Sequence, residues 1–207
     1  MEIQYKFKDK SLLNLAMTQS GINAVHNNER LEFVGDRVLG VTVAAMLYEM
    51  FPNEQEGELS RRFALLVSTE TLADVAITLG IDKDLRHGHM TAGRIRHALA
   101  DATEALIGAI FFDGGFDAAR EFVLNIWRDL AVSIKEAPKD PKTKLQEMIQ
   151  HAVGELPVYT CEQSGAPHSP EFIVTVTAMG KSASGRGSSK KEASTAAAEE
   201  LMKKLAF

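Results

Sequence analysis

Hydrophobic positions recur with helical spacing along the first two thirds of the chain. Apolar residues repeat every three or four positions in segments such as 39–51 and 116–127, which is the spacing of an α-helix with one buried face. The breaks between these segments fall at Phe51-Pro52-Asn53, Leu79-Gly80 and Asp113-Gly114-Gly115. Proline and glycine at such places end helices or form turns. The pattern predicts an all-α unit.

The pattern changes after a short linker around Pro138 and Pro141. Asp140 is placed to cap a short helix, which Gly154 can end. Three segments with the features of strands follow, V-Y-T-C-E, F-I-V-T-V-T-A-M in strict alternation from Phe172, and K-S-A-S-G-R-G, and a last helix begins after Ser189. We therefore predict an α+β protein. An all-α domain covers residues 1–137, and a small αβββα domain covers residues 138–207.

Residues 28–39 carry the first candidate chemistry. Glu29, Glu32 and Asp36 fall within an arc of roughly 60° on a helical wheel, and the apolar Leu31, Val34 and Val38 lie opposite. Carboxylates at this spacing repel one another, and a divalent cation would relieve the repulsion. The alternative is a solvated acidic face that Arg30 and Arg37 partly neutralise.

A second acid pair favours the metal. Asp101 and Glu104 lie in the otherwise almost wholly apolar segment 99–111, and burying an ionised carboxylate without a partner is costly. Oxygen ligands of this kind suit Mg²⁺ or Mn²⁺. The sequence therefore offers candidate ligands for such an ion on two helices, with Glu29, Glu32 and Asp36 on one and Asp101 and Glu104 on the other.

Four motifs, in order, resemble those of the ribonuclease III family, whose members cut double-stranded RNA. They are N-E-R-L-E-F-V-G-D from Asn28, E-G-E-L-S-R-R from Glu56, E-T-L-A from Glu70 and L-A-D-A-T-E-A-L-I-G-A from Leu99. The resemblance implies a Mg²⁺-dependent endoribonuclease, with Mn²⁺ as a possible substitute. Its products would carry 5′-phosphate and 3′-hydroxyl ends with short 3′ overhangs, and its substrates would include ribosomal RNA precursors.

The resemblance also assigns roles to the six acids. Asp36 and Glu104 would be catalytic, and both would bind metal together with Glu32 and Asp101. Glu29 and Glu56 would bind a secondary metal or contact the RNA strand. A catalytically silent RNA-binding scaffold is the alternative, but such a protein would gain nothing from six mutually repelling carboxylates.

The second unit resembles the double-stranded RNA-binding domain over its whole length. The similar segments are P-K-T-K-L-Q-E, G-A-P-H-S-P-E-F and G-S-S-K-K-E-A-S-T-A-A-A. The resemblance implies RNA contacts from residues in the first helix, a loop and the start of the last helix: Thr143, Gln146, Glu147, His168, Lys190 and Lys191. Two lysines in a first helical turn oppose the helix dipole, and an RNA phosphate would reverse that penalty.

Phe33 predicts a homodimer. It lies about 40° from Glu29 on the helical wheel, on the acidic side and away from the apolar face. The family resemblance places a contact with a second subunit at this position. A neighbouring helix of the same subunit could cover the ring instead.

Other features limit the remaining possibilities. The single cysteine, Cys161, excludes an internal disulfide and a zinc finger. No signal peptide or membrane helix is evident, so we expect a cytoplasmic protein without a membrane partner or a small-molecule cofactor. Gln19, Arg37 and the segment 87–97 depart from the family pattern, and these departures bear on substrate preference.

Overall fold

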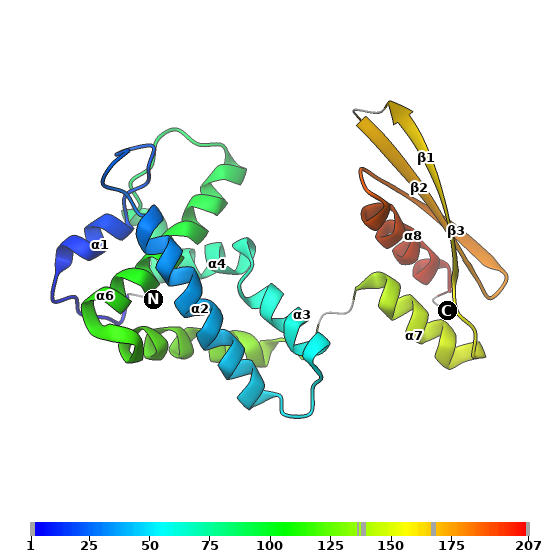
Figure 1. Ribbon diagram of the computed structural model, residues 1–207, viewed down its shortest axis with the longest axis horizontal. Coiled ribbons are helices and arrows are strands. Elements are labelled where there is room, and N and C mark those ends of the chain that lie inside the picture. Colours follow the sequence, from blue (N-terminus) through cyan, green and yellow to red (C-terminus); the bar gives the residue numbers. More distant parts are fainter. Residues whose placement is uncertain (1–2, 136, 138–139, 167–168, 206–207) are drawn as a thin grey trace. The chain divides into compact units, whose positions relative to one another are not determined.

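In the computed structural model, which describes residues 3–135, 137, 140–166 and 169–205, the chain divides into two units, Met1–Pro138 and Lys139–Phe207 (Figure 1). The elements described in the first unit are helices: α1 (Lys10–Ala16), α2 (Glu29–Met50), α3 (Glu56–Leu66), α4 (Thr69–Leu79), α5 (Ile81–Asp84) and α6 (Ala92–Ser133). Among the described residues, no helix is long and apolar enough to cross a membrane.

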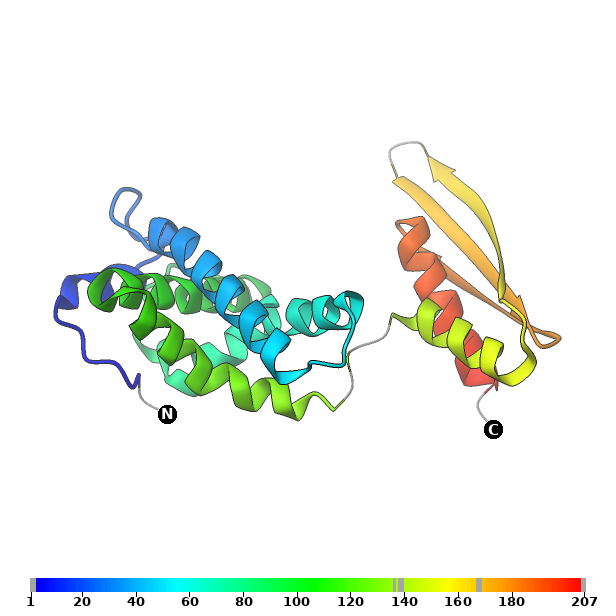
Figure 2. The same cartoon turned by 60° about the horizontal axis from the view of Figure 1, so that its bottom comes forward.

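Helices α2 and α6 pack against each other through the centre of the first unit (Figures 1 and 2). Gly35 faces the backbone of α6, where an added Cβ would overlap the carbonyl oxygen of Glu104. Gly108 faces α2, where a Cβ would overlap the carbonyl oxygen of Leu31. The two backbones therefore touch, and fully buried side chains such as Leu39 extend the contact.

Helix α6 bends at Gly115, whose φ of 83° and ψ of 179° interrupt the helix, as the sequence predicts. Asp113 ties the N-terminal segment to this bend. Its carboxylate accepts hydrogen bonds from the Tyr5 hydroxyl at 2.8 Å and from the backbone N–H groups of Lys8 and Asp9 at 2.9 and 2.8 Å. This burial and pairing raise the pKa of Tyr5 to about 12, with desolvation as the larger cause.

A buried arginine joins the start of α3 to the end of α6. Arg62 is 2% exposed and donates to both carboxylate oxygens of Glu54 at 2.7 and 2.6 Å. It also donates to the carbonyl oxygen of Ile134 at 2.6 Å, and its guanidinium lies 3.9 Å from the ring centroid of Phe51. A buried charge is tolerated when it is paired and hydrogen-bonded in this way.

The second unit has the predicted order: α7 (Pro141–Val153), β1 (Val158–Ala166), β2 (Ser169–Ala178), β3 (Lys181–Gly187) and α8 (Lys190–Leu205). The strands form an antiparallel sheet in the order β1-β2-β3. Asp140 caps α7, and Gly154 ends it with a φ of 73°. Leu145, Val176 and Leu201 are fully buried between the helices and the sheet. The α+β fold class is thereby confirmed.

We predict that Gly35→Ala destabilises the first unit by about 2–3 kcal/mol, because α6 backbone must move to admit the methyl group. Urea denaturation followed by circular dichroism measures the change. Gly93→Ala is the matched control, since its Cβ would enter open space near the start of α6, and alanine there should add up to about 1 kcal/mol. Equal stabilities for the two variants would contradict the close contact.

Candidate active site

The four predicted metal ligands occupy neighbouring positions on α2 and α6. Glu32 and Asp36 belong to α2, and Asp101 and Glu104 belong to α6. They flank the glycine contact, because Gly35 precedes Asp36 and faces the carbonyl of Glu104. All four side chains are partly exposed. The helix pair thus brings acids that are more than 60 positions apart in the sequence into one neighbourhood.

The pKa of Glu104 is shifted by burial and by the other three acids of this neighbourhood. Its pKa is raised from 4.5 to about 8, first by burial and then by the negative charges of Asp36, Glu32 and Asp101. Arg37 acts in the opposite direction. Without a cation, Glu104 therefore holds its proton at neutral pH, because an additional ionised carboxylate would be buried beside three others.

The other acids show the same mutual influence. Burial is the largest cause of the raised pKa of Glu32, followed by Asp101, Glu29 and Asp36. Burial also raises the pKa of Asp101, and the nearby His97 opposes that shift. His97 lies one helical turn before Asp101, a spacing at which side chains meet. The sequence analysis assigned no role to His97, but its spacing of four residues from Asp101 on one helix indicates that the two side chains are neighbours.

The side chains do not form a finished set of metal ligands. Among the described residues, no three His, Cys, Asp or Glu side chains are arranged to hold a metal ion. Asp36 is paired with Arg37 instead, whose Nη1 lies 2.9 Å from Asp36 Oδ2. The donor set still fits a hard divalent cation, since every donor is a carboxylate oxygen. The raised pKa of Glu104 shows that added positive charge would be favourable here.

Glu29 and Glu56, the two predicted site acids outside the group of four, lie in different places. Glu29 is exposed at the start of α2 and contributes to the raised pKa of Glu32. Glu56 is the first residue of α3, and its Oε1 accepts a hydrogen bond from Ser60 at 2.8 Å. It lines a cavity of about 560 Å³ with Tyr48. Glu56 is not among the described residues that shift the pKa values of the four acids.

Phe33 is 61% exposed, so no neighbouring helix among the described residues covers it. The guanidinium of Arg37 lies 4.0 Å from its ring centroid. Val41 and Tyr48, which are 55% and 74% exposed, continue an apolar stripe along the same side of α2. Phe33 also lines a cavity of about 630 Å³ together with Phe112.

The RNA-binding candidates of the second unit lie on the surface. Thr143, Gln146 and Glu147 are exposed on α7. Lys190 and Lys191 are exposed in the first turn of α8, where backbone N–H groups favour anions. His168 lies outside the described residues.

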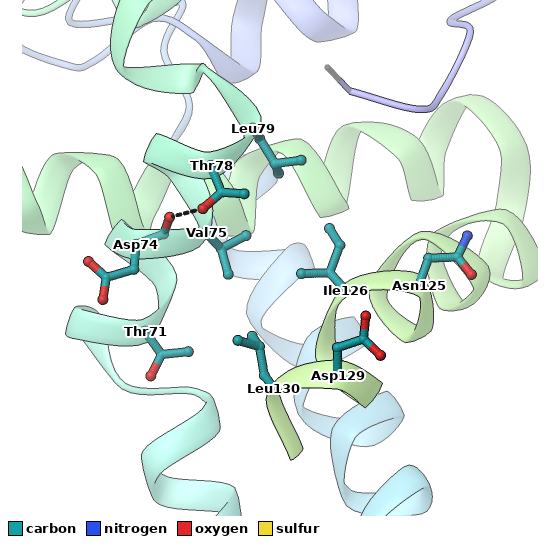
Figure 3. A pocket seen from close by; sticks show the side chains of 9 residues that line it. All are labelled: Thr71, Asp74, Val75, Thr78, Leu79, Asn125, Ile126, Asp129 and Leu130. Atoms are coloured by element: carbon teal, nitrogen blue, oxygen red, sulfur yellow. Dashed lines mark hydrogen bonds between the residues drawn. The ribbon is translucent and has the colours of Figure 1, made fainter. Parts of the chain in front are cut away.

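Another cavity, of about 310 Å³, lies between α4 and the second half of α6 (Figure 3). Val75, Leu79 and Ile126 are apolar residues that line it, and Asp74 and Asp129 line it as well. None of the predicted site residues lines it. The candidate active site therefore rests on the acids of α2 and α6.

Comparison with known protein families gives two matches. Residues 9–130 match the ribonuclease-III-like family, and residues 141–205 match the double-stranded RNA binding motif. Ribonuclease 3 of Vibrio vulnificus (strain YJ016) is 41% identical over 213 residues, which cover 99% of this chain and 94% of that protein. Ribonuclease 3 of Rhizobium meliloti (strain 1021) is 43% identical and covers 86% of this chain and 78% of that protein.

Solved structures agree with these matches. The nuclease domain of ribonuclease III from Campylobacter jejuni aligns with a TM-score of 0.55 and 35% identity, and it covers 61% of this chain and 92% of that chain. That structure was described for flexibility in the region involved in dimer formation. Dicer from Pichia stipitis aligns with a TM-score of 0.53 and 25% identity, covering 96% of both chains.

We predict that the metal-free protein loses stability as the pH rises from about 5 to about 8. An acid whose pKa is higher in the folded state binds more protons when folded, so the free energy of unfolding falls through the window between its two values. For Glu104 that window runs from 4.5 to about 8. Glu104→Gln should flatten this slope in urea denaturation at fixed ionic strength.

The exposed Glu199 supplies the control for this measurement, since Glu199→Gln should leave the slope as it is in the parent protein. An unchanged slope in Glu104→Gln would contradict the assigned electrostatics.

Proposed function

This chain belongs to the ribonuclease III family and is an endoribonuclease that cleaves double-stranded RNA, and from that premise we propose how its residues act. Residues 1–137 form the cleaving domain and residues 138–207 the RNA-binding domain. The observation that supports the proposal is that Glu32, Asp36, Asp101 and Glu104 lie on the two helices that touch at Gly35 and Gly108, where burial and the other three acids raise the pKa of Glu104. A silent RNA-binding scaffold would have no use for this cluster.

Glu32, Asp36, Asp101 and Glu104 would hold Mg²⁺, or Mn²⁺ in its place. A bound ion of this kind lowers the pKa of water and stabilises the charge that develops on the phosphate. In this assignment, Asp36 and Glu104 are the catalytic residues among the four. A bound cation would favour the ionised form of Glu104, because its positive charge would offset the burial and the neighbouring negative charges that raise the pKa of this carboxyl.

The products we propose carry 5′-phosphate and 3′-hydroxyl ends. Water would attack the phosphorus directly, so no serine, cysteine or lysine nucleophile is needed. The bond between phosphorus and the 3′-oxygen would break, and the 3′-oxygen would leave as the hydroxyl end. Glu29 and Glu56 would bind a secondary metal or the cleaved strand from outside the group of four.

The second unit would hold the duplex. Thr143, Gln146 and Glu147, which are exposed on α7, would enter a minor groove, and His168 would reach the next one. Lys190 and Lys191 would contact backbone phosphates at the start of α8. Such contacts read the shape of a duplex rather than its sequence. Structured precursors such as those of ribosomal RNA, in the cytoplasm, are the substrates we propose.

Two subunits would act together on one duplex. The exposed stripe of Phe33, Val41 and Tyr48 gives α2 an apolar face that a second copy can bury. A two-fold axis places one cleaving site on each RNA strand. Cuts offset along the two strands then leave short 3′ overhangs.

We predict that Glu104→Gln abolishes cleavage and leaves RNA affinity nearly unchanged. Glutamine keeps the shape of the side chain but removes a charged ligand. Cleavage of a long duplex in Mg²⁺ gives the first measurement, and a binding titration in Ca²⁺ gives the second. Glu199→Gln on α8 is the control and should cleave normally. Normal turnover by Glu104→Gln would refute the assignment.

We predict that Phe33→Ala weakens the dimer about tenfold or more, since buried aromatic anchors dominate such interfaces. Cleavage should fall at low enzyme concentration and recover as the concentration rises. Sedimentation equilibrium measures the association. Ile77→Ala removes a residue that is 49% exposed on α4 and should change neither property. A native monomer that still makes staggered cuts would refute the proposal.

A further inference from the structure

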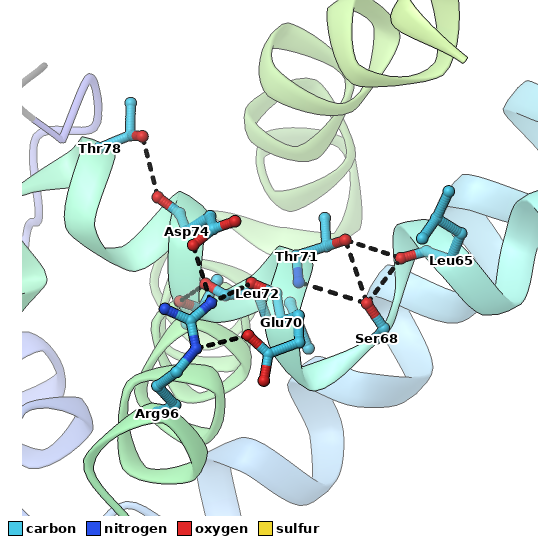
Figure 4. Close-up of polar contacts among 9 residues, drawn as sticks. Leu65, Ser68, Glu70, Thr71, Leu72, Asp74, Thr78 and Arg96 are labelled. Carbon is cyan, nitrogen blue, oxygen red and sulfur yellow. Dashed lines mark hydrogen bonds and ion pairs between the residues drawn. The ribbon is translucent and has the colours of Figure 1, made fainter. Parts of the chain in front are cut away.

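The segment Glu70-Thr71-Leu72-Ala73 matches a family motif, yet none of its residues belongs to the acid cluster. The structure shows that it contacts α6 through Arg96 (Figure 4). Arg96 Nη2 donates to Asp74 Oδ1 at 2.8 Å and to the carbonyl oxygen of Glu70 at 3.2 Å. Arg96 Nε lies 2.5 Å from Glu70 Oε2, an ion pair rather than a well-aligned hydrogen bond.

A second bond joins the same segment to α6 two turns later. The buried hydroxyl of Thr103 lies 3.2 Å from the carbonyl oxygen of Leu72 and 3.0 Å from that of Leu99. Arg96 and Thr103 lie about 20° apart on the helical wheel of α6, so both face α4. Asp101 lies between them in sequence and is about 140° from Arg96 around the helix. Arg96 and Thr103 therefore hold α6 on the side opposite to Asp101, one before it and one after it in the sequence.

In the part of the chain that the structure describes, the first turn of α6 lacks the interactions that usually stabilise the start of a helix. Its N-cap residue, Thr91, makes no side-chain capping bond, and its first turn contains no acid that would favour the helix dipole. Residues 91–94 are exposed. A single exposed ion pair contributes little, but Arg96 is only 33% exposed and binds two carboxylates and a carbonyl at once.

We infer that Arg96 is a positioning residue and that the 70–74 segment is its anchor. From the side facing α4, Arg96 and Thr103 fix the rotation of α6. From the side facing α2, the contacts of Gly35 and Gly108 fix its distance. Together they set where Asp101 and Glu104 present their carboxylates. The inference rests on the proposed metal-binding role of these two acids.

A different role for Arg96 would be direct contact with an RNA phosphate. The two roles affect different kinetic constants. Loss of a phosphate contact weakens RNA binding, so it raises KM and reduces the salt dependence. Loss of positioning leaves RNA binding intact, lowers kcat and raises the Mg²⁺ concentration needed for half-maximal activity.

The test uses the full-length protein and the variants Arg96→Gln, Glu70→Gln and the double variant. For Arg96→Gln we expect kcat to fall about tenfold, because small misplacements of catalytic groups are costly. KM for a long RNA duplex should stay unchanged, and half-maximal activity should require several times more Mg²⁺. The double variant should be no slower than Arg96→Gln alone, because the two residues form one interaction.

Two controls accompany these variants. Glu200→Gln breaks the exposed ion pair with Lys203 on α8 and should leave all constants unchanged. Arg96→Lys keeps the charge but offers a single nitrogen, so its rate should lie between those of Arg96→Gln and the parent protein, including where Arg96→Gln proves too unstable to assay. A rate for Arg96→Lys no better than that of Arg96→Gln would count against the inference.

A raised KM with an unchanged kcat would overturn the inference in favour of an RNA contact. An unchanged kcat and Mg²⁺ dependence would also overturn it. Glu104→Gln, assayed in parallel, separates this failure from failure of the proposed function. If Glu104→Gln is inactive while Arg96→Gln is normal, the positioning role alone is wrong.

Discussion

The candidate active site depends on the close approach of α2 and α6. Gly35 lies against the carbonyl of Glu104, and Gly108 lies against the carbonyl of Leu31. Because neither glycine has a Cβ, the two backbones touch, and the acids beside the contact come within reach of one another. Burial at this contact and the charges of the neighbouring acids together raise the pKa of Glu104. Hydrophobic packing along the two helices holds the carboxylates together despite their repulsion.

Much of this could be predicted from the sequence, because local patterns determine local structure. Helical periodicity defined the first unit, and strict alternation from Phe172 identified the central strand. Gly80 and Gly154 end their helices with φ values of 80° and 73°, as glycine at a helix end suggests. Phe33 was placed on the acidic side of its helix, and it is exposed there.

Such local patterns could not predict which segments that are distant in the sequence contact each other. Periodicity shows which face of a helix is buried but not which helix covers it. The bonds of Asp113 to residues near the N-terminus, and of Arg62 to Ile134, join positions that are 72 or more residues apart. The finished ligand geometry was also not predictable, because a cation has to overcome the repulsion among the acids and the pairing of Asp36 with Arg37.

We propose that these four acids bind a divalent cation between α2 and α6. Crystals of the protein soaked in Mn²⁺ would test this proposal directly, because anomalous scattering locates the ion. We expect a Mn²⁺ peak about 2.1 Å from carboxylate oxygens of the group Glu32, Asp36, Asp101 and Glu104, with both helices contributing ligands. A Mn²⁺ ion bound elsewhere, in a protein that cleaves RNA in Mn²⁺, would contradict it.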